Sequence, residues 1–182
     1  HEIARKVNGV WSSENSDQPA NYDFVPLSQI PNPHVYEWFP QTLKEHISER
    51  VFLVETYRNC PFQCGFCLWG QADNKINGLS TETVIEAFDS LIEMGARHFK
   101  FADAGLGLMK KRDKEIFQHF IEQRLWERGV HLRTYFFWQT LDEEWCQIFR
   151  TLINEKVVGQ LDIGIQTFNP ETLDAMKRPT NY

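Results

Sequence analysis

The sequence lacks the features that mark membrane-spanning, secreted or nucleic-acid-binding chains. No apolar run approaches the roughly 20 residues that cross a bilayer, and the first residues show no signal-peptide pattern. The 19 Lys and Arg residues nearly balance 25 scattered Asp and Glu residues, so strong attraction to nucleic acid or anionic lipid is not expected. We therefore expect a cytoplasmic globular protein with neither nucleic acid nor a membrane as partner.

Cysteine is scarce, but it is unevenly placed. Of the 4 cysteines, Cys60, Cys64 and Cys67 lie within eight residues, and Cys146 stands apart. A disulfide framework is not favoured, because nothing in the sequence points to an oxidising compartment. A tight cysteine cluster in a cytosolic chain indicates a metal or metal-cluster site instead. The first residue is His1 rather than Met, so we expect a piece of a longer protein.

The chain divides by composition near residue 48. Residues 1–48 carry five of the 8 prolines, which exclude long helices because proline lacks an amide donor and restricts the residue before it. We predict an extended proline-rich linker or arm there, with a short helix within residues 40–48. Residues 49–182 are predicted to form the second part of the chain.

In residues 49–182, strand-like and helix-like blocks alternate. Strands are predicted over 51–56, 99–102, 132–137 and 161–168. Helices are predicted over 80–94, over 113–128, after a cap at Asp142 and after Asn169. Strands separated by helices run parallel and are joined by right-handed crossovers, as in a doubly wound sheet or a barrel.

The last strand favours the barrel. Its apolar residues Leu161, Ile163 and Ile165 alternate with Asp162, Gly164 and Gln166, whereas a strand covered on both sides is nearly all hydrophobic. A small, polar face suits a strand that lines a ligand-filled interior. We predict an α/β fold, a partial parallel (β/α) barrel with about four β/α units, whose chemistry lies at the carboxyl ends of the strands.

The cysteine loop directly follows the first predicted strand and has the spacing C-x3-C-x2-C. Thiolates of Cys60, Cys64 and Cys67 can hold three irons of a 4Fe–4S cluster and leave the fourth iron open to a non-protein ligand. A zinc site is an alternative, although zinc takes four ligands and no second cysteine pair or nearby histidine completes the set. A second alternative is a closed cluster in which Cys146 is the fourth ligand. Cys146 lies beside an apolar helix face, however, and this position favours a packing role.

With Phe66 just before the last cysteine, the loop resembles the signature of the radical S-adenosylmethionine (radical SAM) enzymes. The resemblance covers roughly residues 51–182. It implies that the open iron binds the amino and carboxylate groups of the methionine moiety, and that Phe66 packs against the adenine. It also implies that one electron from the cluster breaks a carbon–sulfur bond to give a 5′-deoxyadenosyl radical.

The resemblance extends to further cofactor-binding residues. Asp103, in Ala102-Asp103-Ala104-Gly105, stands where many family members hold the methionine amino group; a turn aspartate is the alternative. Gln166 matches a strand-four residue that reaches the ribose or carboxylate, unless its role is a structural hydrogen bond. Arg178 resembles a family arginine that meets the methionine carboxylate, unless it is simply solvated. Arg58 and Lys100 are candidates to tune the cluster by their charge, and a role at the surface or at the rim of the barrel is the alternative for each.

The proline-rich arm and the residues around the cysteines look like one subgroup, the cobalamin-binding radical SAM proteins. That subgroup includes methyltransferases and the anaerobic magnesium-protoporphyrin ester cyclase. Full barrels of the family have six strands, so the fragment is expected to be incomplete. Its reductant would be a protein such as flavodoxin or ferredoxin, and its substrate, small molecule or peptide, is not indicated. The alternative from another class is a non-catalytic binding module stabilised by zinc or by an iron–sulfur cluster.

Overall fold

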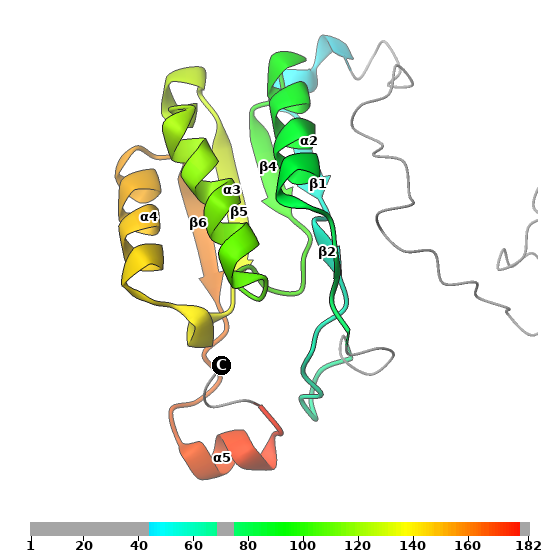
Figure 1. Ribbon diagram of the computed structural model, residues 1–182, viewed down its shortest axis with the longest axis vertical. Coiled ribbons are helices and arrows are strands. Elements are labelled where there is room, and N and C mark those ends of the chain that lie inside the picture. The colour runs from blue at the N-terminus through cyan, green and yellow to red at the C-terminus, as the bar shows by residue number, and fades with distance from the viewer. Residues whose placement is uncertain (1–43, 69–74, 179–182) are drawn as a thin grey trace, which may run out of the picture.

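The computed structural model describes residues 44–68 and 75–178 (Figure 1). Its main sheet has four strands in the order β1-β4-β5-β6, and each neighbouring pair is parallel. The strands are β1 (Val51–Val54), β4 (His98–Phe101), β5 (His131–Phe136) and β6 (Val158–Ile163). The predicted α/β fold, with parallel strands joined through helices, is confirmed.

Three long helices cover one face of this sheet: α2 (Thr81–Glu93), α3 (Lys110–Glu122) and α4 (Glu143–Asn154) (Figure 1). Two of these helices, α2 and α4, begin after the N-cap residues that the sequence predicts. Ser80 Oγ accepts the amide of Thr83 at 3.2 Å, and Asp142 Oδ1 accepts the amide of Trp145 at 3.0 Å, so each satisfies a donor that has no partner inside its helix.

The core between sheet and helices is built largely from aromatic rings. Phe88 of α2 is fully buried and contacts Phe99, Phe101 and Phe120, with ring centroids 5.1, 5.4 and 4.9 Å away. Phe117 continues this cluster to Trp145 of α4. Rings from all three helices therefore fasten the helical layer to the strands.

The other face of the sheet is open within the part of the chain that the structure describes. On β1, Leu53 is 61% exposed, whereas its neighbours Phe52 and Val54 are buried against the helices. Lys100 and Arg133 lie in register with Leu53 on the same exposed face. This alternation is that of strands whose second face would line a barrel interior.

Three predicted elements differ from the structure by more than one residue at an end. The fourth strand, predicted over 161–168, spans Val158–Ile163, because Val158 pairs with Leu132 and Gln166 has a left-handed φ of 70° that a strand does not accept. The second helix, predicted over 113–128, spans Lys110–Glu122: it begins before Asp113, and it ends before Arg124, which has a φ of 48°. A separate 3-10 turn, η4 (Leu125–Arg128), follows.

The first predicted strand, 51–56, is shorter than expected and leads into a small hairpin that the sequence did not predict. There β2 (Tyr57–Arg58) pairs antiparallel with β3 (Asn77–Gly78). The remaining short elements are η3 (Ile47–Glu49), η5 (Trp138–Thr140) and α5 (Pro170–Ala175). The predicted start of α5 is confirmed: Asn169 Oδ1 accepts the amide of Thr172 at 3.0 Å. In Figure 1, α5 lies beyond the carboxyl ends of the strands.

The predicted arm, residues 1–48, falls outside the described residues except for its last five. The division of the chain at residue 48 therefore stays a prediction. Among the described helices, none combines the length and the apolar character needed to cross a membrane.

Replacing Phe88 with Ala should lower the free energy of unfolding by about 3–5 kcal/mol, because it leaves a cavity among rings that cannot close over it. Urea denaturation of the two proteins measures the loss. Leu53→Ala, at an exposed position, should change stability by less than about 0.5 kcal/mol. Equal losses in the two variants would contradict this description of the core.

Candidate functional site

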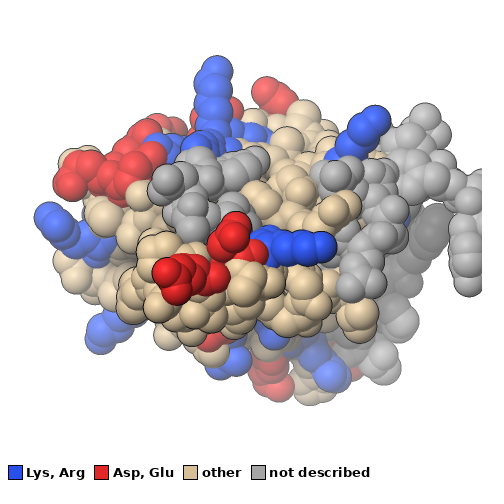
Figure 2. Space-filling view, turned by 90° about the horizontal axis from the view of Figure 1, so that it is seen from below, with Lys and Arg blue, Asp and Glu red and all other residues tan. Residues whose placement is uncertain are grey.

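A cavity of about 270 Å³ opens where the strands end. It is lined by Cys60, Phe62, Cys64, Phe66, Cys67, Asp103, Ala104, Tyr135, Phe137, Gln166 and Arg178. All seven residues predicted for the site are in this set, although they come from three distant stretches of the chain. Viewed from this end, the molecule shows acidic and basic groups interspersed among uncharged side chains (Figure 2).

The three thiols of the loop differ in burial. Cys64 is buried, and Cys60 and Cys67 are half-buried at the cavity; all are free of disulfides. Burial raises the pKa of Cys60, and the neighbouring Cys64 and Cys67 raise it further, whereas the positive charge of Arg178 lowers it. Within 44–68 and 75–178, no three His, Cys, Asp or Glu side chains are grouped closely enough to hold a single metal ion.

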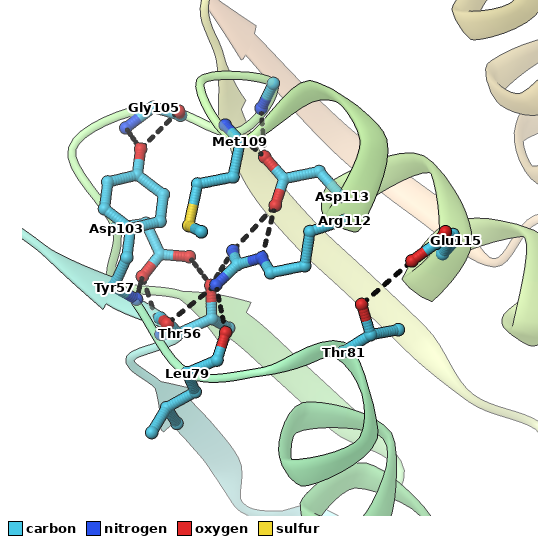
Figure 3. Close-up of polar contacts among 11 residues, drawn as sticks. Thr56, Tyr57, Leu79, Thr81, Asp103, Gly105, Met109, Arg112, Asp113 and Glu115 are labelled. Atoms are coloured by element: carbon cyan, nitrogen blue, oxygen red, sulfur yellow. Dashed lines mark hydrogen bonds and ion pairs between the residues drawn. The ribbon is translucent and has the colours of Figure 1, made fainter. Parts of the chain in front are cut away.

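The loop is fixed at its start by Asp103, which follows β4 (Figure 3). One carboxylate oxygen, Oδ1, accepts the amides of Thr56 and Tyr57 at 2.7 and 3.0 Å, and Oδ2 accepts the Thr56 hydroxyl at 2.7 Å. Burial outweighs these hydrogen bonds and raises the pKa of Asp103 to about 6. Asp103 thus lines the cavity and also ties β4 to the end of β1.

Tyr57 makes a second tie between the same two segments. Its hydroxyl accepts the amide of Gly105 at 2.8 Å and donates to the carbonyl of Gly105 (Figure 3). Burial is the main cause that raises the pKa of Tyr57, so the phenol keeps its proton. The backbone before the cysteines is therefore held from two sides.

Beneath these residues lies a buried ion pair that sequence reasoning missed (Figure 3). Arg112 Nη2 is 2.6 Å from Asp113 Oδ1, and the guanidinium also donates to the carbonyls of Thr56 and Leu79 and to the Thr56 hydroxyl. Asp113 Oδ2 accepts the amides of Gly107 and Met109. The pair joins the end of β1, the segment after β3 and the start of α3.

Arg178 lies just past α5, within the cavity. Its guanidinium carbon is 5.1 Å from the ring centroid of Phe137 and 6.0 Å from that of Phe66. Nη2 donates to the carbonyl of Gly164 at 2.8 Å, and the amide of Gly65 donates to the carbonyl of Met176 at 2.8 Å. The end of α5 is thus attached to the cysteine loop.

Other residues considered from the sequence lie elsewhere. Arg58 pairs with Glu55, with both carboxylate oxygens within 3.1 Å of its guanidinium. Lys100 is exposed on the open face of the sheet and does not line the cavity. Cys146 is half-buried on α4 and does not line the cavity. Tyr135, in contrast, reaches the cavity from β5.

The buried carboxyl of Asp103 predicts a pH effect on stability. The pKa of Asp103 is about 6 in the folded chain, whereas an ordinary aspartate has a pKa of 3.8. The folded chain therefore binds this proton more tightly than the unfolded chain does. The resulting stabilisation is complete below the lower value and is lost as pH rises through about 6. Urea denaturation between about pH 4 and pH 7 should therefore show a decline in the unmodified protein that is smaller in Asp103→Asn.

Asp174→Asn, which alters an exposed carboxylate of α5, is the matched control and should keep the decline of the unmodified protein. Parallel profiles for the unmodified protein and Asp103→Asn would contradict the raised pKa.

Comparisons with solved structures show similarity in fold. TsrM of Kitasatospora setae, a radical S-adenosylmethionine methyltransferase solved with tryptophan substrate and aza-SAM, aligns at a TM-score of 0.62 and 17% identity, over 77% of this chain and 27% of that one. OxsB, a cobalamin-dependent S-adenosylmethionine radical enzyme solved with aqua-cobalamin and S-adenosylmethionine, aligns at 0.55 and 16%, over 71% and 20%. This chain therefore spans only about a fifth to somewhat over a quarter of the length of these relatives.

No curated protein matches the chain. A sequence model of the radical SAM superfamily, in contrast, matches residues 54–182, which include the cysteine loop, β4 to β6 and α5. The match covers well over half of the chain, and it agrees with the fold of the two solved relatives. The protein belongs to the radical SAM superfamily.

Proposed function

We propose that this chain is the part of a radical SAM enzyme that holds a 4Fe–4S cluster on Cys60, Cys64 and Cys67. The observation that carries the proposal is that all three thiols line one cavity at the carboxyl ends of parallel strands. Three thiolates leave one iron of such a cluster without a protein ligand, which is where S-adenosylmethionine would bind. When bound, the cluster would supply the electron that cleaves a carbon–sulfur bond of that cofactor.

The residues around the thiols suit the cofactor's parts. In this proposal, Phe66 packs against the adenine and Gln166 contacts the ribose or carboxylate. Both line the cavity, and Phe66 is 49% exposed there, so its ring has room for a partner. Arg178 offers a cation for the methionine carboxylate, and Asp103 a carboxylate for the amino group. Asp103 accepts three hydrogen bonds from the end of β1, so it would serve the cofactor and the fold together.

Part of the cavity wall is apolar. The rings of Phe62 and Phe137 stack at a centroid distance of 4.7 Å along the cavity wall, and Phe137 is buried. Apolar walls limit water at a reactive centre and strengthen the electrostatic interactions inside it. A reductant such as flavodoxin or ferredoxin, and a cytoplasmic location, belong to the same proposal.

The solved relatives favour a role for cobalamin in the whole protein. One TsrM structure holds cobalamin and a 4Fe–4S cluster, and the OxsB structure holds aqua-cobalamin and S-adenosylmethionine. We propose cobalamin-dependent methyl transfer, or an oxidative cyclisation like that of magnesium-protoporphyrin ester cyclase, for the intact enzyme. The cobalamin would be bound by a domain other than the described barrel strands, since the relatives are several times longer than this chain.

A non-catalytic module, in which the same thiols bind zinc or a closed cluster, is the second candidate function. The observation behind it is that the same three thiols are free of disulfides and line one cavity, which a zinc site or a closed cluster would also use. The two functions differ in metal content and in response to S-adenosylmethionine, so one set of measurements separates them.

Anaerobic reconstitution should give about four irons and four sulfides per chain, with an electron paramagnetic resonance signal of the reduced cluster that changes on addition of S-adenosylmethionine. Cys60→Ala, Cys64→Ala and Cys67→Ala should each lose most of the iron, because each removes one of the three proposed ligands. Cys146→Ala is the matched control and should keep iron, sulfide and signal.

Zinc without iron uptake would contradict the radical SAM function and favour the binding module. A four-iron cluster whose signal ignores S-adenosylmethionine would do the same, because its fourth iron would then be closed. Loss of the cluster in Cys146→Ala would identify Cys146 as a fourth ligand.

A further inference from the structure

The cavity contains one buried positive charge. Among the described residues that line it, Arg178 is the only Lys or Arg, and it is 7% exposed. Its Nη2 is used by the carbonyl of Gly164, whereas its buried Nε has no hydrogen-bond partner among the described residues. A buried guanidinium with an unused donor is costly unless negative charge lies nearby.

The position of Arg178 is fixed with respect to the cysteine loop. The amide of Arg178 donates to the carbonyl of Leu173, which continues the turn that ends α5. The carbonyl of Met176, two residues earlier, accepts the amide of Gly65, which lies between Cys64 and Cys67. Phe66 and Phe137 flank the guanidinium at distances typical of cation–π contacts. The charge is therefore held by the loop that carries the thiols.

The other two cations considered for the cluster are poorly placed to act on it. Arg58 is neutralised by Glu55 at a distance of 2.9 Å, and both side chains are more than a third exposed. Lys100 is exposed on the open sheet face, where water screens its charge. A buried charge is screened much less, so Arg178 has the stronger influence on the thiols.

We propose that Arg178 compensates the negative charge of the three thiolates and thereby raises the reduction potential of the cluster they hold, before any S-adenosylmethionine binds. The inference rests on the proposed function. Reduction adds one electron from an external reductant to a cluster that three thiolates already make negative. A nearby fixed cation stabilises this more negative state over the oxidised state, and cluster potentials respond to such charges. The role differs from a contact with the methionine carboxylate, because it needs no cofactor.

The test is a potentiometric titration of the reconstituted chain, followed by electron paramagnetic resonance without S-adenosylmethionine. Arg178→Gln should shift the midpoint potential to a more negative value, and Arg178→Lys, which keeps the charge, should stay close to the unmodified protein. Arg150→Gln removes the same charge from an exposed position on α4 and should not shift the potential. Iron and sulfide are measured in each variant. The affinity for S-adenosylmethionine is measured separately.

An unchanged potential in Arg178→Gln, with weaker S-adenosylmethionine binding, would overturn the inference and leave Arg178 as a cofactor contact. If Arg178→Gln holds no cluster, retention in Arg178→Lys supports the inference, and equal loss in Arg178→Lys overturns it. An unmodified chain that takes up no iron overturns the proposed function and the inference with it. An intact cluster with an unmoved potential overturns the inference alone.

Discussion

The guanidinium of Arg112 is the junction on which the site depends. It donates to two carbonyls and one hydroxyl that lie 33 and 56 residues away in sequence, and it is neutralised by its own neighbour, Asp113. The Thr56 hydroxyl that it contacts passes the interaction on to Asp103. A buried charge that loses its partner is strongly destabilising. The pair therefore stabilises the arrangement of the surrounding segments in which all of these contacts are made. The cysteine loop starts from that arrangement.

Much of the fold could be predicted because its signals are local. Helix α4 has an apolar residue every third or fourth position behind a capping Asp142, and these features act within one turn. The hairpin of β2 and β3 has no such signal, since each strand has two residues. The burial of the Arg112–Asp113 pair could not be predicted from the sequence either. The pair stands in the run Lys110-Lys111-Arg112-Asp113, which resembles a solvated helix start, and its burial depends on residues far away in the chain.

The membership of the site could be predicted for a topological reason. Parallel strands end at the same edge of a sheet, so the segments after β1, β4 and β6 all begin at that edge, and residues chosen from each of them share one cavity. The surroundings of the charged side chains were harder to predict. The pairing of Arg58 with Glu55 and the enclosure of Arg178 depend on side-chain directions that sequence spacing does not contain. The roles of the cofactor-binding residues remain predictions from the family resemblance.

The hydrogen bond from Gly65 to Met176 also has a consequence for how the protein is made. Its two ends are more than a hundred residues apart, so the cysteines leave the ribosome long before the segment that contacts their loop. Contacts of such large sequence separation form late, because the chain entropy of closing the loop must be overcome first. Until α5 docks, the cysteine loop lacks this backbone contact. The loop that carries the thiols is therefore expected to reach its final conformation only after residues 170–178 have been synthesised and α5 has folded.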